Sequence, residues 1–257
     1  MIGRAAALLL AVAFAGEAQA RITPEQYRAI AVTLPDNASL PLVTSVTDES
    51  GRQHSLADFV DRPTVFVFAD YACRTLCGPA VAFVADALEQ SGLRAGEQFR
   101  LVVMGLGDGA EGAGIGTWRE HLRGSRVDAA TAFLTADHRT IAAATAALGY
   151  HYRYDPEAGQ YIHPAAAFVL RADGKVSRVL TELGLTPQDL RLALIEASEG
   201  RIGTLGDQVR LICSAFDPRT GGYTLAISRV LAGAGGVTVL LLVGGIVLLS
   251  RAGRGAA

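Results

Sequence analysis

The chain has 257 residues, half of them hydrophobic, and a formal net charge of −2. This hydrophobic content can form a sizeable core, which excludes a wholly disordered chain. The nearly neutral charge and the absence of an arginine cluster exclude a nucleic-acid-binding surface, so no nucleic acid is expected among the partners.

The N-terminus has the three parts of a secretory signal peptide. Arg4 supplies the positive charge, Ala5–Ala15 the apolar stretch, and Ala18-Gln19-Ala20 the cleavage pattern. We therefore predict a signal peptide over residues 1–20, followed by a loosely packed lead-in segment over 21–39. Export places the rest of the chain in an oxidising compartment, where disulfides are permitted.

From residue 40 to residue 203 the sequence alternates between strand and helix patterns. The first predicted elements are a hairpin that begins at Leu40–Val46 and turns at Asp48–Gly51, a short helix near Leu56–Val60, a buried strand at Thr64–Ala69, a helix at Pro79–Ser91 and a strand at Phe99–Met104. The later ones are a short helix near Thr117–Leu122, a strand at Thr131–Thr135, a helix from Asp137 to Leu148, a hairpin of Ala165–Leu170 and Val176–Thr181 around Asp173-Gly174, and a helix at Thr186–Glu199. This order predicts an α/β fold, a thioredoxin-like three-layer domain.

The C-terminal part contains a long uncharged stretch. Val230–Ser250 is long enough to span a hydrocarbon core of about 30 Å, which predicts a single transmembrane helix. Residues 204–229 then form a juxtamembrane linker, and the arginines that flank the stretch predict a cytoplasmic tail over 251–257. These features predict a single-pass protein of a bacterial inner membrane, with its globular domain in the periplasm.

Two cysteines, Cys73 and Cys77, follow the predicted strand Thr64–Ala69 and are separated by three residues. A disulfide between them would close a very small loop and remove little entropy from the unfolded chain. Pro79, as an early helical residue, places Cys77 near a helix N-terminus, where a thiolate is favoured. We therefore expect a functional dithiol, which does either redox or soft-metal chemistry.

A histidine would complete a soft-metal site, because Cu(I) accepts two thiolates and one imidazole. The candidates are His54, His121, His138, His151 and His163. His163 stands apart because it comes just before the strand Ala165–Leu170, and in a thioredoxin-like sheet that turn faces the cysteine loop. His151 is the reserve ligand. The third cysteine, Cys213, could pair between chains or exchange with Cys73 or Cys77, and the favoured interpretation is that it is buried and inert.

The chain resembles the Sco/SenC family of membrane-tethered, thioredoxin-like copper proteins that assist cytochrome c oxidase assembly. The resemblance runs through Thr64–Ala69, Cys73-x-x-x-Cys77, Gly149-Tyr150, Tyr161-Ile162-His163 and Asp173–Arg178. A block from Asp189 to Gly203, together with Cys213, Asp217-Pro218, Gly221 and Tyr223, resembles a bacterial subgroup with a C-terminal membrane anchor. The resemblance implies that Cys73, Cys77 and His163 are copper ligands and that cytochrome c oxidase subunit II is the partner. The chain departs from the family pattern at Arg74, at Pro164 and in the loop Gly105–Gly116.

Two functions follow from this site. The favoured one is a copper metallochaperone that delivers copper to the copper-A site of cytochrome c oxidase by ligand exchange, which is not an enzymatic reaction. The alternative is a thiol–disulfide oxidoreductase that reduces the acceptor's cysteines, with Cys73 as nucleophile and Cys77 resolving the mixed disulfide. Other periplasmic copper carriers or thiol reductants are further candidate partners.

Overall fold

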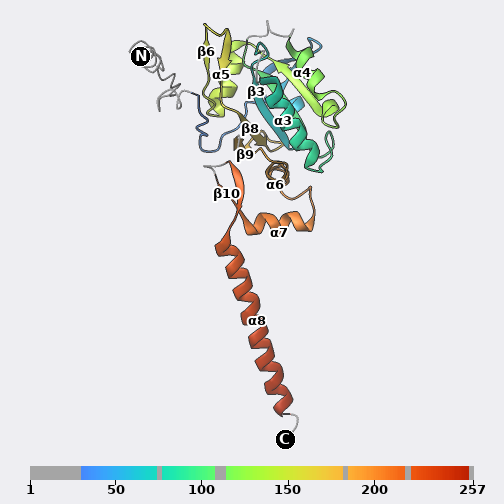
Figure 1. Ribbon diagram of the computed structural model, residues 1–257, viewed down its shortest axis with the longest axis vertical. Helices are drawn as coiled ribbons and strands as arrows, with labels where there is room; N and C mark the ends of the chain where they lie inside the picture. The colour runs from blue at the N-terminus through green and yellow to red at the C-terminus, as the bar shows by residue number, and fades with distance from the viewer. Residues whose placement is uncertain (1–29, 74–76, 108–113, 182–184, 218–220, 255–257) are drawn as a thin grey trace, which may run out of the picture.

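The computed structural model describes residues 30–73, 77–107, 114–181, 185–217 and 221–254 (Figure 1). The predicted signal peptide over 1–20, Arg74 and the central part of the loop Gly105–Gly116 lie outside these residues.

The domain is built on a seven-stranded mixed sheet with strand order β2-β1-β5-β4-β3-β8-β9. Its strands are β1 (Ser45–Asp48), β2 (Gln53–Ser55), β3 (Thr64–Ala69), β4 (Arg100–Gly105), β5 (Thr131–Thr135), β8 (Ala166–Leu170) and β9 (Val176–Thr181). β3 pairs parallel to β4 and antiparallel to β8, and all six of its residues are buried. Its β-branched and aromatic sequence fits a strand that is covered on both faces.

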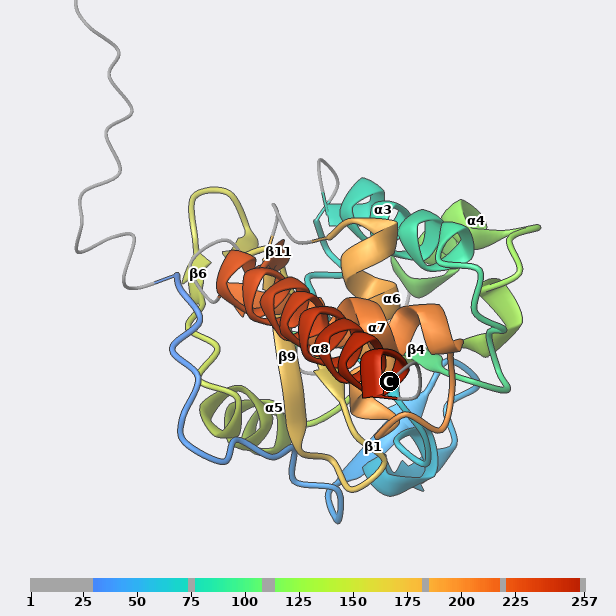
Figure 2. The same cartoon turned by 90° about the horizontal axis from the view of Figure 1, so that it is seen from below.

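Helices cover both faces of this sheet and complete three layers. α3 (Cys77–Gln90), α4 (Ile115–Leu122) and α6 (Pro187–Ala197) pack on one face, whereas the 3-10 helix η1 (Leu56–Phe59) and α5 (His138–Ala147) pack on the other. Figure 2 shows α5 on the opposite side of the strands from α3 and α4. Alternate residues of β3 point to the two cores, Val65 and Val67 to one and Phe66 and Phe68 to the other. The predicted three-layer α/β fold is confirmed.

Local signals set several of the boundaries. Asp137 caps α5 by accepting a hydrogen bond from the Thr140 amide at 2.7 Å, and Thr186 caps α6 in the same way. Gly174 has φ +81° in the turn between β8 and β9, and a Cβ there would lie 2.9 Å from Leu42. The Asp173-Gly174 hairpin is therefore confirmed, and its turn requires glycine.

The first hairpin starts later than the sequence predicts. β1 begins at Ser45, not at Leu40, because Pro41 has no amide hydrogen and its carbonyl accepts the Thr44 hydroxyl at 2.7 Å in a local turn. Leu40 is nevertheless buried, and its amide donates to the Gly174 carbonyl at 3.0 Å. The segment before β1 thus packs on the domain without belonging to the sheet.

Residues 204–229, which the sequence predicts to be a linker, contain regular secondary structure. They form α7 (Leu205–Cys213) and a hairpin of β10 (Ser214–Asp217) and β11 (Gly222–Leu225). Asp207 of α7 pairs with Arg191 of α6 at 2.6 Å, and the Tyr223 hydroxyl of β11 donates to Glu196 of α6 at 2.5 Å. Side-chain contacts therefore fix this C-terminal unit to α6.

The chain ends in α8 (Ile227–Arg254), which projects away from the domain beyond α7 (Figure 1). Within the residues that the structure describes, no helix has both the length and the apolar character to cross a membrane. The predicted transmembrane helix at Val230–Ser250 is thus not supported by the described residues.

Candidate functional site

The cysteine loop begins directly after the central strand β3. Asp70 follows the last strand residue, and the Cys73 amide donates to the Asp70 carbonyl at 3.0 Å, which closes a tight turn. The Cys73 side chain is partly exposed. Cys77 is the first residue of α3, so its backbone lies at the helix end where unpaired amides favour a thiolate. The side chain of Cys77 lies outside the described residues, as do residues 74–76.

Tyr71 anchors this loop beneath the site. Its hydroxyl donates to the carbonyls of Val103 at 2.9 Å and Leu134 at 3.2 Å, and burial raises its pKa. Gly105, at the end of β4, and Gly114 make room for Tyr71, because a Cβ at either position would lie 2.8 Å or 2.3 Å from it. This close approach explains why glycine is required at Gly105 and Gly114, the two described positions of the loop Gly105–Gly116 that contact Tyr71.

His163 lies in the connection between β7 (Gln160–Ile162) and β8. β7 pairs with β6 (Arg153–Asp155) in a small hairpin that the sequence did not predict, since each strand has only three residues. The Nδ1 atom of His163 lies 2.9 Å from the hydroxyl of Tyr150 and 3.3 Å from the carbonyl of Pro164. The peptide bond between His163 and Pro164 is trans, as are the other described peptide bonds.

These contacts determine which nitrogen of His163 carries the proton. The Tyr150 hydroxyl donates its only hydrogen to the Pro164 carbonyl at 2.9 Å. It therefore accepts from the imidazole, and the carbonyl, which cannot donate, accepts from the same nitrogen. Both contacts require a hydrogen on Nδ1, so we assign the Nδ1–H tautomer from the hydrogen-bond network. Nε2 then carries the lone pair that a metal or an acid could use.

Burial favours the neutral form of this imidazole. The pKa of His163 is lowered chiefly because burial disfavours the charged ring, while the Pro164 carbonyl and the negative charge of Asp70 oppose the shift. A metal ligand must be unprotonated at the binding nitrogen, and a lowered pKa maintains that state near neutral pH.

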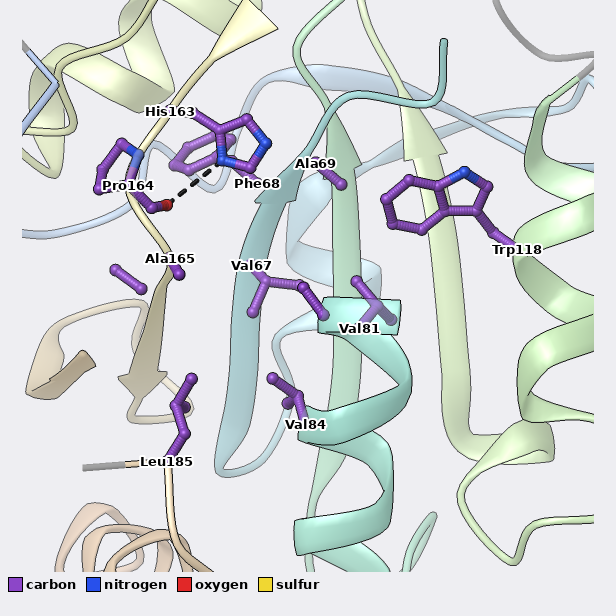
Figure 3. Close-up of a pocket in the computed structure, with 12 residues that line it drawn as sticks. Val67, Phe68, Ala69, Val81, Val84, Trp118, His163, Pro164, Ala165 and Leu185 are labelled. Atoms are coloured by element: carbon purple, nitrogen blue, oxygen red, sulfur yellow. Dashed lines mark hydrogen bonds between the residues drawn. The ribbon is translucent and has the colours of Figure 1, made fainter. Parts of the chain in front are cut away.

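His163 and the first turn of α3 line one small cavity of about 60 Å³. Its walls are apolar, with Val67, Val81 and Trp118 among the lining residues (Figure 3). Ala80, one turn after Cys77, also lines this cavity, so the helix end with the second cysteine and the imidazole border the same space. His151 is not one of the described residues that line this cavity.

The predicted site residues have different outcomes. Cys73 and Cys77 flank one loop, and His163 faces the cavity at the adjoining helix end, but no described group of three His, Cys, Asp or Glu residues is placed to hold a metal. The predicted set includes the side chain of Cys77, so this finding leaves the set untested. His151 is exposed, and its amide donates to the Ala31 carbonyl at 3.0 Å. Cys213 ends α7, and its side chain lies outside the description.

Two residues that contact the site, Tyr150 and Asp70, are not among the site residues predicted from the sequence; Tyr150 is marked there only by the family resemblance. Tyr150 is buried, and its ring centroid lies 4.6 Å from that of Phe68. Asp70 is completely buried, and its carboxylate accepts hydrogen bonds from two backbone amides. The aspartate directly after a buried strand was the only available hint.

Comparisons with known proteins identify the fold of this chain but do not test its site residues. No family model and no curated protein matches the sequence. Among solved structures, the chain is similar to a protein of Aquifex aeolicus VF5 proposed to act in electron transfer, with TM-score 0.56 and 14% identity over 64% of this chain and 95% of that one. It is also similar to a SCO1/SenC family lipoprotein of Bacillus anthracis str. Ames, with TM-score 0.52 and 17% identity over 66% and 98%. A third match is Arabidopsis thaliana ScoI with copper bound, with TM-score 0.50 and 10% identity over 63% and 96%. The chain thus shares the thioredoxin-like fold of Sco/SenC structures at low sequence identity.

Proposed function

We propose that this protein is a copper carrier of the Sco/SenC type, which binds Cu(I) through Cys73, Cys77 and His163. The observation that carries the proposal is that His163 holds Nδ1 in hydrogen bonds and lines the same cavity as the first turn of α3, which begins at Cys77. The copper bound in the structurally similar Arabidopsis protein supports the same cargo.

The donor chemistry fits this cargo. Two thiolates and one neutral imidazole suit the soft Cu(I) ion better than a hard cation such as Mg²⁺. The acceptor would be the copper-A site of cytochrome c oxidase subunit II, whose thiolates would replace those of the carrier one at a time. No covalent bond of a substrate changes in this transfer, so the protein acts by binding and delivery.

A thiol–disulfide oxidoreductase is the second candidate, and one observation favours it. Cys77 is the first residue of α3, and Cys73 is partly exposed, which suits a nucleophile and a resolving cysteine. In that reaction the Cys73 thiolate would attack the acceptor's disulfide, and the Cys77 thiolate would then displace the acceptor's dithiol and leave Cys73–Cys77 oxidised. Such a cycle has no need of His163 as a ligand.

His163→Ala separates the two functions. An outer partner of a metal ligand is typically worth 10–100-fold in affinity, so loss of a ligand should weaken copper binding by at least about 100-fold. Anaerobic Cu(I) titration of the reduced full chain measures this loss, and His151→Ala serves as the control because His151 is exposed and away from the cavity. Unchanged copper affinity together with intact disulfide reductase activity would instead support the oxidoreductase.

We also propose that the protein is tethered to a bacterial inner membrane with its domain in the periplasm. The support is the uncharged sequence Val230–Ser250 and the exposure of Leu240 and Leu241 on α8, at 73% and 72%. Alkaline extraction of membranes should leave the full chain in the pellet and release a variant that lacks residues 230–250. Release of both proteins would rule out the tether without affecting the copper proposal.

A further inference from the structure

We propose that Asp70 is a positioning residue that holds the cysteine loop and the His163 segment at a fixed separation. The inference deepens the proposed copper function, since its effect is read through copper binding. Asp70 touches neither reacting atoms nor cargo in this role; it acts through the two segments that carry the ligands.

One carboxylate joins both sides of the site. Oδ1 of Asp70 accepts the Ala72 amide at 3.0 Å, and Oδ2 accepts the Tyr161 amide at 2.7 Å. Ala72 immediately precedes Cys73, and Tyr161 lies two residues before His163. Both segments are therefore fixed to the same fully buried side chain.

The second hydrogen bond matters because β7 has no place in the main sheet. In the described part of the chain, β6 and β7 form a separate two-stranded sheet, so strand pairing does not fix the position of β7 relative to β3. The bond from the Tyr161 amide to Asp70 supplies such a link between the hairpin and the end of β3. Tyr150 orients the imidazole ring, whereas Asp70 places the backbone from which the ring projects.

A carboxylate is specifically suited to this task. A turn after β3 needs only one acceptor oxygen, which asparagine would also provide. Asp70 must accept from two amides on opposite sides, and an amide side chain would present an NH₂ group to one of them. Burying a polar group is costly unless it is hydrogen-bonded, and both oxygens of Asp70 have an amide partner here.

The test is a double-mutant cycle on the full chain with Cu(I) as the probe. Asp70→Asn should weaken copper binding by about 10–100-fold, as for other outer partners of metal ligands. If Asp70 acts through His163, adding Asp70→Asn to His163→Ala should cause little further loss, because residues that act together are not additive. A loss of the same size in both backgrounds, or no loss in either, would overturn the inference.

A second pair of variants covers a failure of Asp70→Asn to fold. Tyr161→Pro removes the amide that reaches Asp70, and Tyr161→Ala keeps that amide while removing the same ring. Copper binding should be at least 10-fold weaker in Tyr161→Pro than in Tyr161→Ala, and equal affinities would contradict the proposal. X-ray absorption at copper should show imidazole scattering in wild type and a reduced contribution in Asp70→Asn, which a general loss of stability would not produce.

The outcomes for Asp70 and for the proposed function are distinguishable. If His163→Ala itself leaves copper affinity unchanged, the copper function fails. If His163→Ala loses affinity while Asp70→Asn and Tyr161→Pro do not, only the positioning role fails.

Discussion

Asp70 and Asp207 are both buried carboxylates, but they are compensated in different ways. Asp207 faces the guanidinium of Arg191 with both oxygens, at 2.8 Å and 2.6 Å, and its charge is neutralised by a cation. Asp70 accepts two backbone amides, and within the described residues no Arg or Lys forms an ion pair with it. The ion pair of Asp207 therefore fastens α7 to α6, whereas the amide-bound carboxylate of Asp70 joins the turn after β3 to the β6–β7 hairpin.

The largest effect should come from breaking the ion pair. Asp207→Asn leaves a largely buried Arg191 without its partner, and loss of one member of such a pair typically costs about 3 kcal/mol. Urea unfolding at pH 7 measures this decrease. Copper affinity should be unchanged, because the ion pair is far from the cysteine loop. Arg191 also donates to the carbonyl of Ser91, which lies just past the end of α3 and about 20 Å along the helix from Cys77.

Lowering the pH should reduce the difference in unfolding free energy between Asp207→Asn and wild type. Arg191 holds the pKa of Asp207 well below its usual range, so the pair stabilises the fold above the ordinary carboxyl pKa of about 4. That contribution is lost as the pH falls through the lowered pKa of the folded state. The gap in unfolding free energy should therefore narrow below about pH 4. A gap that stays constant to pH 2 would mean that the charge of Asp207 contributes nothing.

The same contrast explains which parts of the molecule could be predicted. The buried run of β3, the caps Asp137 and Thr186, and the Asp173-Gly174 turn are local patterns, and each is confirmed. Asp70 acts across 91 residues through a single hydrogen bond, which no periodicity reveals. The strands β6 and β7 are too short for an alternating pattern, and α7 and the β10–β11 hairpin are held by isolated side-chain contacts with α6.

Of the candidate ligands, Cys73 and Cys77 were predictable because their spacing and place after β3 are written in adjacent residues. His163 could be selected from five histidines only by its position before a strand. The state of its ring could not be predicted, because it depends on the Tyr150 hydroxyl and on a carbonyl that the fold brings to the same nitrogen.

A smaller effect should follow from Tyr150→Phe, which tests the orientation of His163 separately from the placement by Asp70. The substitution keeps the ring that stacks on Phe68 and removes the hydroxyl that accepts from Nδ1. Copper affinity should fall by about 10-fold, the lower end of the range for outer partners, because the Pro164 carbonyl still accepts from Nδ1 at 3.3 Å. Cu(I) titration measures the loss, and Tyr152→Phe is the matched control in the same aromatic cluster.

Imidazole ¹⁵N chemical shifts provide a readout that stability alone would not move. Wild-type His163 should be found as the Nδ1–H tautomer, because the Tyr150 hydroxyl has given its hydrogen to Pro164 and can only accept. In Tyr150→Phe the Nε2–H tautomer should gain population, which blocks the nitrogen that we assign to copper. A proton on Nε2 in wild type would contradict the assignment, because the hydrogen bond between Tyr150 and His163 would then run in the opposite direction. In that case the ring could not bind copper through Nε2 without first losing that proton.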